Sequence, residues 1–117
     1  MTIQKFEDII AWQKAQDLAT EIYQSFGILN DFAFRDQITR AAISISNNIA
    51  EGFDRKSDKE FARFLHIALG STSELRSMLY LGERLRYIQN GHSKKLIEKS
   101  IEISKLIRGF IKALEPN

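Results

Sequence analysis

Residues 37–52 of the chain read QITRAAISISNNIAEG, and this stretch indicates the fold better than any other. Its apolar residues recur at the spacing of one helical face, while polar residues with little charge fill the opposite face. Because asparagine amides compete for the helical backbone, Asn47 and Asn48 inside such a helix indicate a structural or contact role. The apolar face comprises Phe34, Ile38, Ala41, Ala42, Ile45, Ile49 and Phe53. The polar face comprises Gln37, Arg40, Ser44, Asn47, Asn48 and Glu51.

Three further amphipathic segments accompany this one, joined by connections of the length found between antiparallel neighbours. The only proline is Pro116, so no ring interrupts the helical segments. The sequence therefore predicts an all-α fold, an antiparallel up-down-up-down four-helix bundle that forms a single domain over residues 1–117. The expected helices span about 7–26, 31–54, 57–88 and 93–114.

Local signals set the expected helix ends. Gly27 suits the end of the first helix, and Ser57 with Glu60 three residues later forms a capping-box pattern at the start of the third. We expect the third helix to continue to the turn signal Asn90-Gly91, after which Ser93 caps the fourth helix.

Composition narrows the class of protein. The chain has 117 residues, 44% of them apolar, and contains no cysteine, which excludes disulfides, thiolate metal sites and a cysteine nucleophile. The N-terminal sequence MTIQKFEDII has no long apolar run, so we expect neither a signal peptide nor a membrane anchor. These features favour a cytoplasmic protein that does not bind membranes.

The first expected helix has an apolar arc wider than the stripe of about 100° that a core-facing helix needs, which permits a second buried contact. Trp12 and Tyr23 lie within this arc, so packing explains them better than stacking on nucleic-acid bases. Small residues at 68 and 70–73 would let another helix approach closely. Packing inside the bundle is the simpler explanation for them, and a subunit interface is the alternative.

The first three expected helices carry a series of motif residues: Phe6-Glu7-Asp8, Trp12-Gln13-Lys14-Ala15, Tyr23, Gln37, Arg40-Ala41-Ala42, Ser44-Ile45, Asn48-Ile49-Ala50-Glu51-Gly52, Arg55, Ser57, Glu60-Phe61, Phe64-Leu65, Ala68, Gly70-Ser71 and Glu74-Leu75. With this pattern the chain resembles the 23S rRNA intervening-sequence proteins, a bacterial family of four-helix-bundle proteins also labelled S23 ribosomal protein-like. It departs from the family at Ser46 and in residues 28–31, where relatives often have proline.

The resemblance implies a homo-oligomer, because related proteins form ring-like pentamers. A similar accessory protein of diversity-generating retroelements is a basic pentamer that partners a reverse transcriptase and nucleic acid. The family brings no catalytic residues and no cofactor. The motif residues to which we assign structural or interface roles are Trp12, Arg40, Asn48, Glu51, Gly52, Gly70, Ser71 and Glu74.

Basic residues gather in two places, although the net charge is only +2. A ring of subunits would multiply either group and make it more effective toward phosphates. The competing interpretation is a solvated face, in which these residues pair with nearby carboxylates at helical spacing. The first group is Arg55, Lys56, Lys59 and Arg63, and the second is Lys94, Lys95 and Lys99.

Patterns for catalysis are missing from the sequence. The two histidines, His66 and His92, have no partner at the spacing that places metal ligands on one helical face, and no phosphate loop or nucleophile turn occurs. Glu51 and Glu74 are paired carboxylates in one interpretation, but interhelical contacts with Arg40, Asn47 or Asn48 explain them better. We therefore expect no enzyme, metal or cofactor.

Two hypotheses about function follow. In the first, the protein is a non-enzymatic oligomeric accessory factor that associates with RNA or DNA through its basic residues. In the second, it is a scaffold that binds a protein partner and has no nucleic-acid role.

Overall fold

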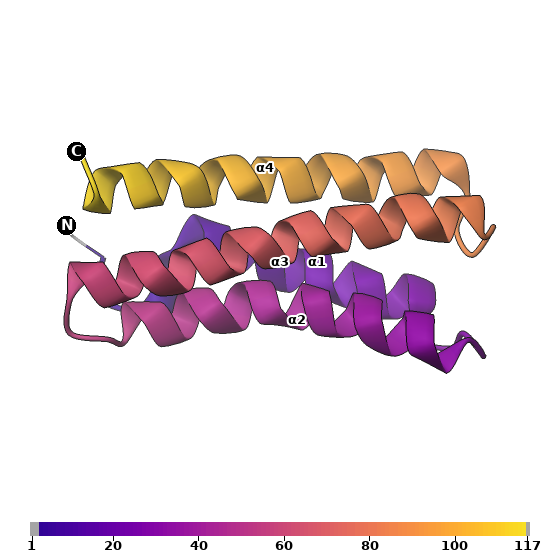
Figure 1. The fold of residues 1–117 in the computed structure, drawn as a ribbon, viewed down its shortest axis with the longest axis horizontal. Helices are drawn as coiled ribbons and strands as arrows, with labels where there is room; N and C mark the ends of the chain where they lie inside the picture. Colours follow the sequence, from indigo (N-terminus) through magenta and orange to yellow (C-terminus); the bar gives the residue numbers. More distant parts are fainter. Residues whose placement is uncertain (1–2, 117) are drawn as a thin grey trace.

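The periodic apolar residues form four long helices in the computed structural model, which describes residues 3–116. A short 3-10 helix, η1 (Phe6–Asp8), precedes α1 (Ile10–Phe26), α2 (Phe32–Phe53), α3 (Asp58–Arg84) and α4 (Asn90–Leu114). Successive helices run in opposite directions, and the bundle measures 43 × 21 × 20 Å (Figure 1). The all-α four-helix bundle predicted from the sequence is therefore confirmed.

The four helices form a bundle in which α1 and α3 occupy diagonal corners. Both α2 and α4 pack against α1 and against α3, whereas the backbones of α1 and α3 do not come close to each other within the described residues. The α2–α3 turn lies at one end of the bundle with both chain termini (Figure 1). The α1–α2 and α3–α4 connections lie together at the other end.

The core is one continuous cluster of apolar side chains from all four helices. In α2 the face predicted to be apolar lies inside, where Ile38, Ala42, Ile45 and Ile49 are completely buried. Burial of one large aliphatic side chain contributes roughly 1.5–3 kcal/mol, so this cluster is the main driving force for folding. The largest fully buried side chains from the other helices are Leu18, Ile22, Phe26, Leu65, Leu75, Leu79, Leu96, Ile103 and Ile107.

Hydroxyl groups join three pairs of neighbouring helices. These bonds satisfy buried polar atoms, and among the described residues no buried side-chain nitrogen or oxygen lacks a partner. Ser46, one of the departures from the family pattern, is 1% exposed and takes part in this arrangement. The bonds join Gln16 Nε2 to Ser46 Oγ at 3.0 Å, Ser71 Oγ to Ser44 Oγ at 2.8 Å, and Thr72 Oγ1 to Ser104 Oγ at 2.8 Å.

The start of α1 lies three residues later than predicted. The chain forms η1 first, and Ile9 then has an extended backbone, with φ −77° and ψ 120°, before α1 begins at Ile10. The side chain of Ile9 is 2% exposed, so the extended residue between η1 and α1 directs this apolar side chain into the core. Gln13 Nε2 donates to the Glu7 carbonyl at 2.8 Å and spans the bend.

Two predicted helix ends are confirmed. α1 ends before Gly27, although Gly27 keeps a helical φ of −64° and does not use the left-handed region. The Ser57 hydroxyl accepts the backbone N–H of Glu60 at 3.1 Å, which is the hydrogen bond expected of the N-cap of α3.

The predicted α3–α4 connection is wrong. α3 ends at Arg84 and does not continue to Ile88, and Asn90-Gly91 begins α4 instead of forming the turn. Ser93, the predicted cap, is fully buried within α4. A Schellman motif ends α3: Arg86 N–H donates to Glu83 O at 3.1 Å, and Tyr87 N–H donates to Gly82 O at 2.9 Å.

Arg86 occupies the position of this motif that usually holds glycine. Its φ of +63° is left-handed, and within residues 3–116 no other residue has a positive φ. The signal for a helix end was therefore absent from the sequence, because glycine or asparagine normally marks it.

Gly52 lies where α2 packs closely against α3. A Cβ atom on Gly52 would lie 2.5 Å from Phe64 Cβ and 3.0 Å from Phe61 Cδ1. Gly70, in contrast, has no neighbouring atom within 4 Å of its Cβ position and lies on the outside. The small residues of α3 therefore divide, because Ala68, Ser71 and Thr72 pack inside while Gly70 stays at the surface.

We predict that Gly52→Ala lowers the free energy of unfolding by about 1–3 kcal/mol, because the new methyl group meets the rigid start of the Phe64 side chain. Gly70→Ala is the matched control. It should raise stability by roughly 0.5–1 kcal/mol, because alanine loses less backbone freedom in an exposed helix. Urea unfolding monitored by circular dichroism measures both. Equal effects of the two substitutions would contradict the close approach at Gly52.

We predict that Arg86→Gly raises the free energy of unfolding by about 1 kcal/mol, because glycine adopts the left-handed conformation without the steric cost of a Cβ atom. The same urea titration tests this. A loss of stability would mean that the arginine side chain contributes more to the fold than its backbone conformation costs.

Candidate nucleic-acid interface

The two predicted basic groups lie at opposite ends of the bundle. Arg55, Lys56, Lys59 and Arg63 surround the α2–α3 turn, whereas the second group lies in the first turns of α4, beside the α3–α4 connection (Figure 1). One copy of the protein therefore does not combine them into a single surface.

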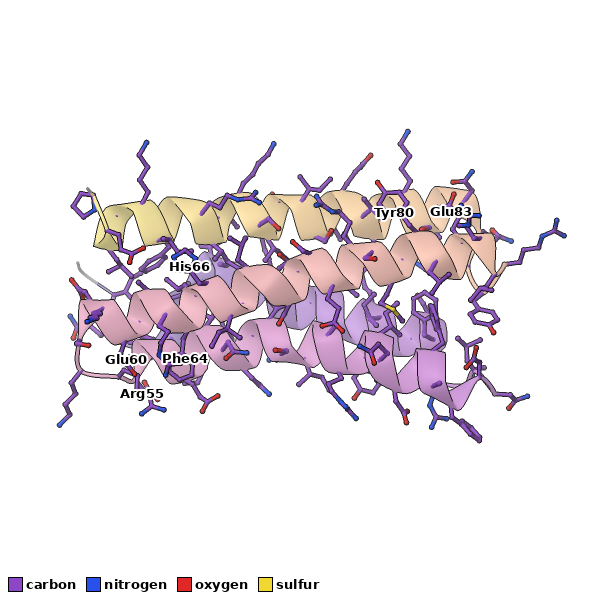
Figure 2. All side chains as sticks on the ribbon, in the orientation of Figure 1. Arg55, Glu60, Phe64, His66, Tyr80 and Glu83 are labelled. Carbon is purple, nitrogen blue, oxygen red and sulfur yellow. The ribbon has the colours of Figure 1, made fainter. Side chains whose placement is uncertain are left out.

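Two arginines of the α2–α3 group, Arg55 and Arg63, contact other side chains of the protein. Arg63 donates to both carboxylate oxygens of Glu60, at 3.1 and 3.2 Å. The guanidinium carbons of Arg55 and Arg63 lie 4.9 and 4.7 Å from the centre of the Phe64 ring. Figure 2 shows Arg55, Glu60 and Phe64 together at this end of the bundle. The hydrogen bonds from Arg63 lower the pKa of Glu60, and the carboxylate raises the pKa of Arg63. Both side chains thus stay charged and held together.

The remaining residues of this group, Lys56 and Lys59, are exposed. Neither forms an ion pair within residues 3–116. Asp54 and Asp58 stand beside them in the sequence. Residues 54–63 contain four basic and three acidic side chains, so this segment has a net charge of +1.

Lys99 of the second group is engaged in holding α4 against α1. Its Nζ lies 2.6 Å from Glu21 Oε2, and Lys14 of α1 reaches Glu102 of α4 at 3.4 Å. The alternative interpretation of this group expected pairing with nearby carboxylates at helical spacing, but the observed pairs join two helices. Lys94 and Lys95 are exposed and form no ion pair within the described part of the chain.

The structure adds two basic residues that the sequence reasoning missed. Arg84 ends α3 and Arg86 lies in the α3–α4 connection, so both are at the same end as Lys94 and Lys95. Residues 83–95 contain four basic side chains and one acidic side chain, giving a net charge of +3. Counting charge on both sides of the connection would have found this group. It was overlooked because residues 85–88 were expected to continue the helix.

Tyr87 fixes the α3–α4 connection to the start of α2. Its hydroxyl donates to Asp31 Oδ2 at 2.7 Å, and its ring packs edge-on against Phe34 with centroids 5.0 Å apart. Asp31 Oδ1 accepts the Phe34 N–H at 3.1 Å and caps α2. The hydroxyl and then this N–H lower the pKa of Asp31, whereas the carboxylate raises the pKa of Tyr87. One carboxylate thus holds two chain segments.

The polar motif residues of α2 and α3 have varied surroundings. Asn48 Nδ2 donates to the Ser44 carbonyl at 2.8 Å and to its hydroxyl at 2.9 Å, and Ser71 also bonds that hydroxyl. Asn48 therefore supports the α2–α3 contact through Ser44. Glu74 does reach across to α2, but its partner is Gln37 and not Arg40, Asn47 or Asn48.

Arg40 and Glu51 make no interhelical contact of the predicted kind. Both are exposed, and within residues 3–116 neither has a side-chain hydrogen bond or ion pair. The prediction for Glu51 is therefore wrong. Its position near the end of α2 points it away from α3, since Gly52 is the residue that faces Phe64.

Apolar side chains remain exposed on two diagonal helices. On α1, Tyr23 is 50% exposed, and Trp12 is half-buried with its ring edge-on to Phe6 at 5.3 Å. On α3, Tyr80 and Leu81 are 54% and 43% exposed. The wide apolar arc predicted for the first helix is thus only partly covered by the rest of the chain.

The sequence also led us to expect no metal site and no membrane-spanning helix. Residues 3–116 contain no group of three or more His, Asp or Glu side chains arranged to hold a metal ion. His66 is exposed, and its Nε2 lies 3.2 Å from Glu115 Oε1. Within the same residues, no helix combines the length and hydrophobicity needed to span a membrane.

The fold and surface together define a small four-helix-bundle protein with exposed basic residues at both ends. The model of the 23S rRNA-intervening sequence protein family matches residues 7–109, and the chain therefore belongs to this family. The resemblance noted in the motif residues is thereby confirmed.

A solved structure from the same family supports the fold. The chain is similar to a protein of unknown function of the S23 ribosomal protein family from Bacteroides thetaiotaomicron VPI-5482, with 30% identity and a TM-score of 0.82. The match covers 88% of this chain and 99% of that one. No curated protein sequence matches the chain.

We predict that Tyr87→Phe destabilises the protein at neutral pH and has less effect in acid. The folded pKa of Asp31 lies below its ordinary value of 3.8, so its stabilising contribution is present above that value and is lost as pH falls through the folded pKa. Removing the hydroxyl removes the largest cause of this shift. Urea midpoints of both proteins between about pH 7 and about pH 3 provide the test. A difference independent of pH would contradict the coupling of Tyr87 to the Asp31 carboxylate.

Proposed function

We propose that the protein is a non-enzymatic, oligomeric accessory protein that associates with RNA, and that ribosomal RNA is its first candidate partner. The observation that carries this proposal is the exposed basic surface at both ends of a bundle that belongs to the 23S rRNA-intervening sequence protein family. Such a role would place the protein in the cytoplasm.

The charge distribution supports an electrostatic mode of binding. Lys94, Lys95, Lys56 and Lys59 are exposed and are not engaged in ion pairs within the described residues. Lysines of this kind release condensed counterions when they contact phosphates, and their affinity therefore falls steeply with salt. The small net charge of +2 is thus compatible with RNA binding, because the distribution of charge matters more than its total.

We also propose that the protein forms a homo-oligomer, which the resemblance suggests is a pentamer. Most of the large exposed apolar residues lie on α1 and α3, the two helices at diagonal corners of the bundle, and the others are Ile28, Phe32 and Leu85 near that end of the bundle where the α1–α2 and α3–α4 connections lie. Two different faces on opposite sides favour a heterologous contact between copies, and a heterologous contact that closes produces a ring. Each ring would then present several copies of the same basic ends.

A protein-interaction scaffold is the second candidate function. It is favoured by the outer face of α3, where the uncharged residues Ile67, Gly70, Ser73, Ser77 and Tyr80 are exposed, with His66 and Glu74 as the ionisable residues among them. In this function the basic residues serve solubility only, and RNA would not change the assembly.

Light scattering distinguishes these functions. We expect a particle of about five times the 13.5 kDa protomer mass, which gains the mass of a structured 23S rRNA fragment at about 50 mM salt and loses it near 200 mM. An oligomer indifferent to RNA at low salt would contradict the RNA function and leave the scaffold. A 13.5 kDa monomer would contradict the oligomer built on α1 and α3.

A further inference from the structure

The end of the bundle formed by the α3–α4 connection carries the denser positive charge. Arg84, Arg86, Lys94 and Lys95 are all exposed there. Within residues 3–116 none of the four forms an ion pair, whereas Arg63 at the other end is held by Glu60, and Lys99 is held by Glu21.

Residues 83–95 contain fewer acidic side chains than the segment at the opposite end, although Asp31 of the neighbouring α1–α2 connection bonds Tyr87. Glu83 is the single acidic residue of 83–95, and the net charge of that segment is +3, compared with +1 for residues 54–63. Glu98 follows Lys94 by one helical turn, but with lysine N-terminal to glutamate the pair has the less favourable order. A phosphate backbone would therefore meet a larger attraction at the α3–α4 end.

A shallow surface hollow of about 480 Å³ lies beside Arg86. Its lining residues are Glu83, Arg86, Tyr87, Ile88, Gln89 and Asn90. The amides of Gln89 and Asn90 offer both donors and acceptors, which suit the edge of a base, while Tyr87 and Ile88 offer apolar surface. Phosphates and an unpaired base could thus be bound side by side.

An exposed aromatic side chain extends this surface along α3. Tyr80 is 54% exposed and precedes Arg84 by one helical turn, so the two side chains lie on the same face. Figure 2 shows Tyr80 and Glu83 on the part of α3 that approaches this end. Aromatic rings close to basic residues are the usual platform for unpaired bases, because stacking does not depend on base identity.

The position of Arg86 indicates a role beyond the turn. Glycine would satisfy the left-handed conformation of this residue, yet the chain places an exposed arginine there. The connection is also held in place, because Tyr87 bonds Asp31 and packs on Phe34. The guanidinium of Arg86 and the hollow are thereby carried by a fixed segment, which lowers the ordering cost of binding.

We propose that the α3–α4 end is the RNA-binding edge of the protein, where Arg84, Arg86, Lys94 and Lys95 bind the phosphates of an unpaired RNA segment and the adjoining hollow accepts one base. This inference rests on the proposed RNA function and narrows it to one end of the bundle. The α2–α3 end then contributes little to affinity.

The main test compares two variants that each remove four positive charges. One carries Arg84→Gln, Arg86→Gln, Lys94→Gln and Lys95→Gln, and the matched control carries Arg55→Gln, Lys56→Gln, Lys59→Gln and Arg63→Gln. Fluorescence anisotropy with a labelled 23S rRNA hairpin should show at least about tenfold weaker binding for the first variant. Its salt dependence should also be shallower, since each lost phosphate contact removes about 0.7 from the slope. The control should stay within about threefold of the wild type.

Arg86→Gly separates charge from folding. This substitution should weaken RNA binding while it raises resistance to urea, so the loss cannot come from unfolding. Retention of full affinity by both Arg86→Gly and the four-residue α3–α4 variant would overturn the proposal. Equal losses in the two four-residue variants would overturn it as well, since they would indicate diffuse charge and no preferred edge.

The hollow has its own test. Gln89→Ala removes a lining amide, and the Gln89 side chain makes no capping hydrogen bond to α4, so the fold should be unaffected. We expect this variant to bind the hairpin less tightly while its affinity for a blunt RNA duplex is unchanged. Equal binding of hairpin and duplex by the wild type would overturn the base-accepting role.

The experiments also separate this inference from the proposed function. If the wild type bound no RNA at low salt, both the proposed RNA function and this inference would be overturned. If the wild type bound RNA but the α3–α4 substitutions did not weaken binding, only this inference would be overturned.

Discussion

The close packing of α2 against α3 is the contact on which the rest of the bundle depends. It requires a glycine at position 52, because the backbone of α2 lies against the Phe64 and Phe61 side chains with no room for a methyl group. Farther along the same pair, Ser71 bonds Ser44, and Gln37 bonds Glu74. Steric fit therefore sets the distance between the two helices, and polar pairs set their register. α1 and α4 then cover the two apolar sides that remain.

The two ends of this bundle differ in how they are held together. At the α2–α3 turn, Glu60 and Phe64 engage the arginines, so much of the positive charge is used within the protein. At the α3–α4 connection, a neutral hydroxyl and an aromatic contact from Tyr87 hold the chain, and the basic side chains are not needed for that purpose. This difference is why the exposed charge of the second end is available to a partner.

Helix content and the faces of the helices followed from local sequence, as residues 34–53 illustrate. The wrong predictions concern residues whose structure depends on a contact with a residue far away in the sequence. The end of α3 was missed because Arg86 replaces the expected glycine, while Tyr87 is drawn to Asp31, 56 residues earlier in the chain. The predicted hydrogen-bond partners of Glu74 were wrong for the same reason. Sequence spacing does not show which polar residue of α2 faces Glu74, and the structure shows that it is Gln37. The basic residues were identifiable from sequence, but their pairing was not.

The sequence by itself determined that the chain forms four amphipathic helices, that they pack as an all-α bundle, and that the chain belongs to its family. Periodicity and motif residues are local properties, and short connections leave few ways to arrange four helices. Only the tertiary structure decided that Lys99 belongs to an ion pair with α1 and that Tyr87 joins the α3–α4 connection to Asp31. Those arrangements depend on which residues meet across helices, and electrostatic pairing is governed by distance in space and not along the chain.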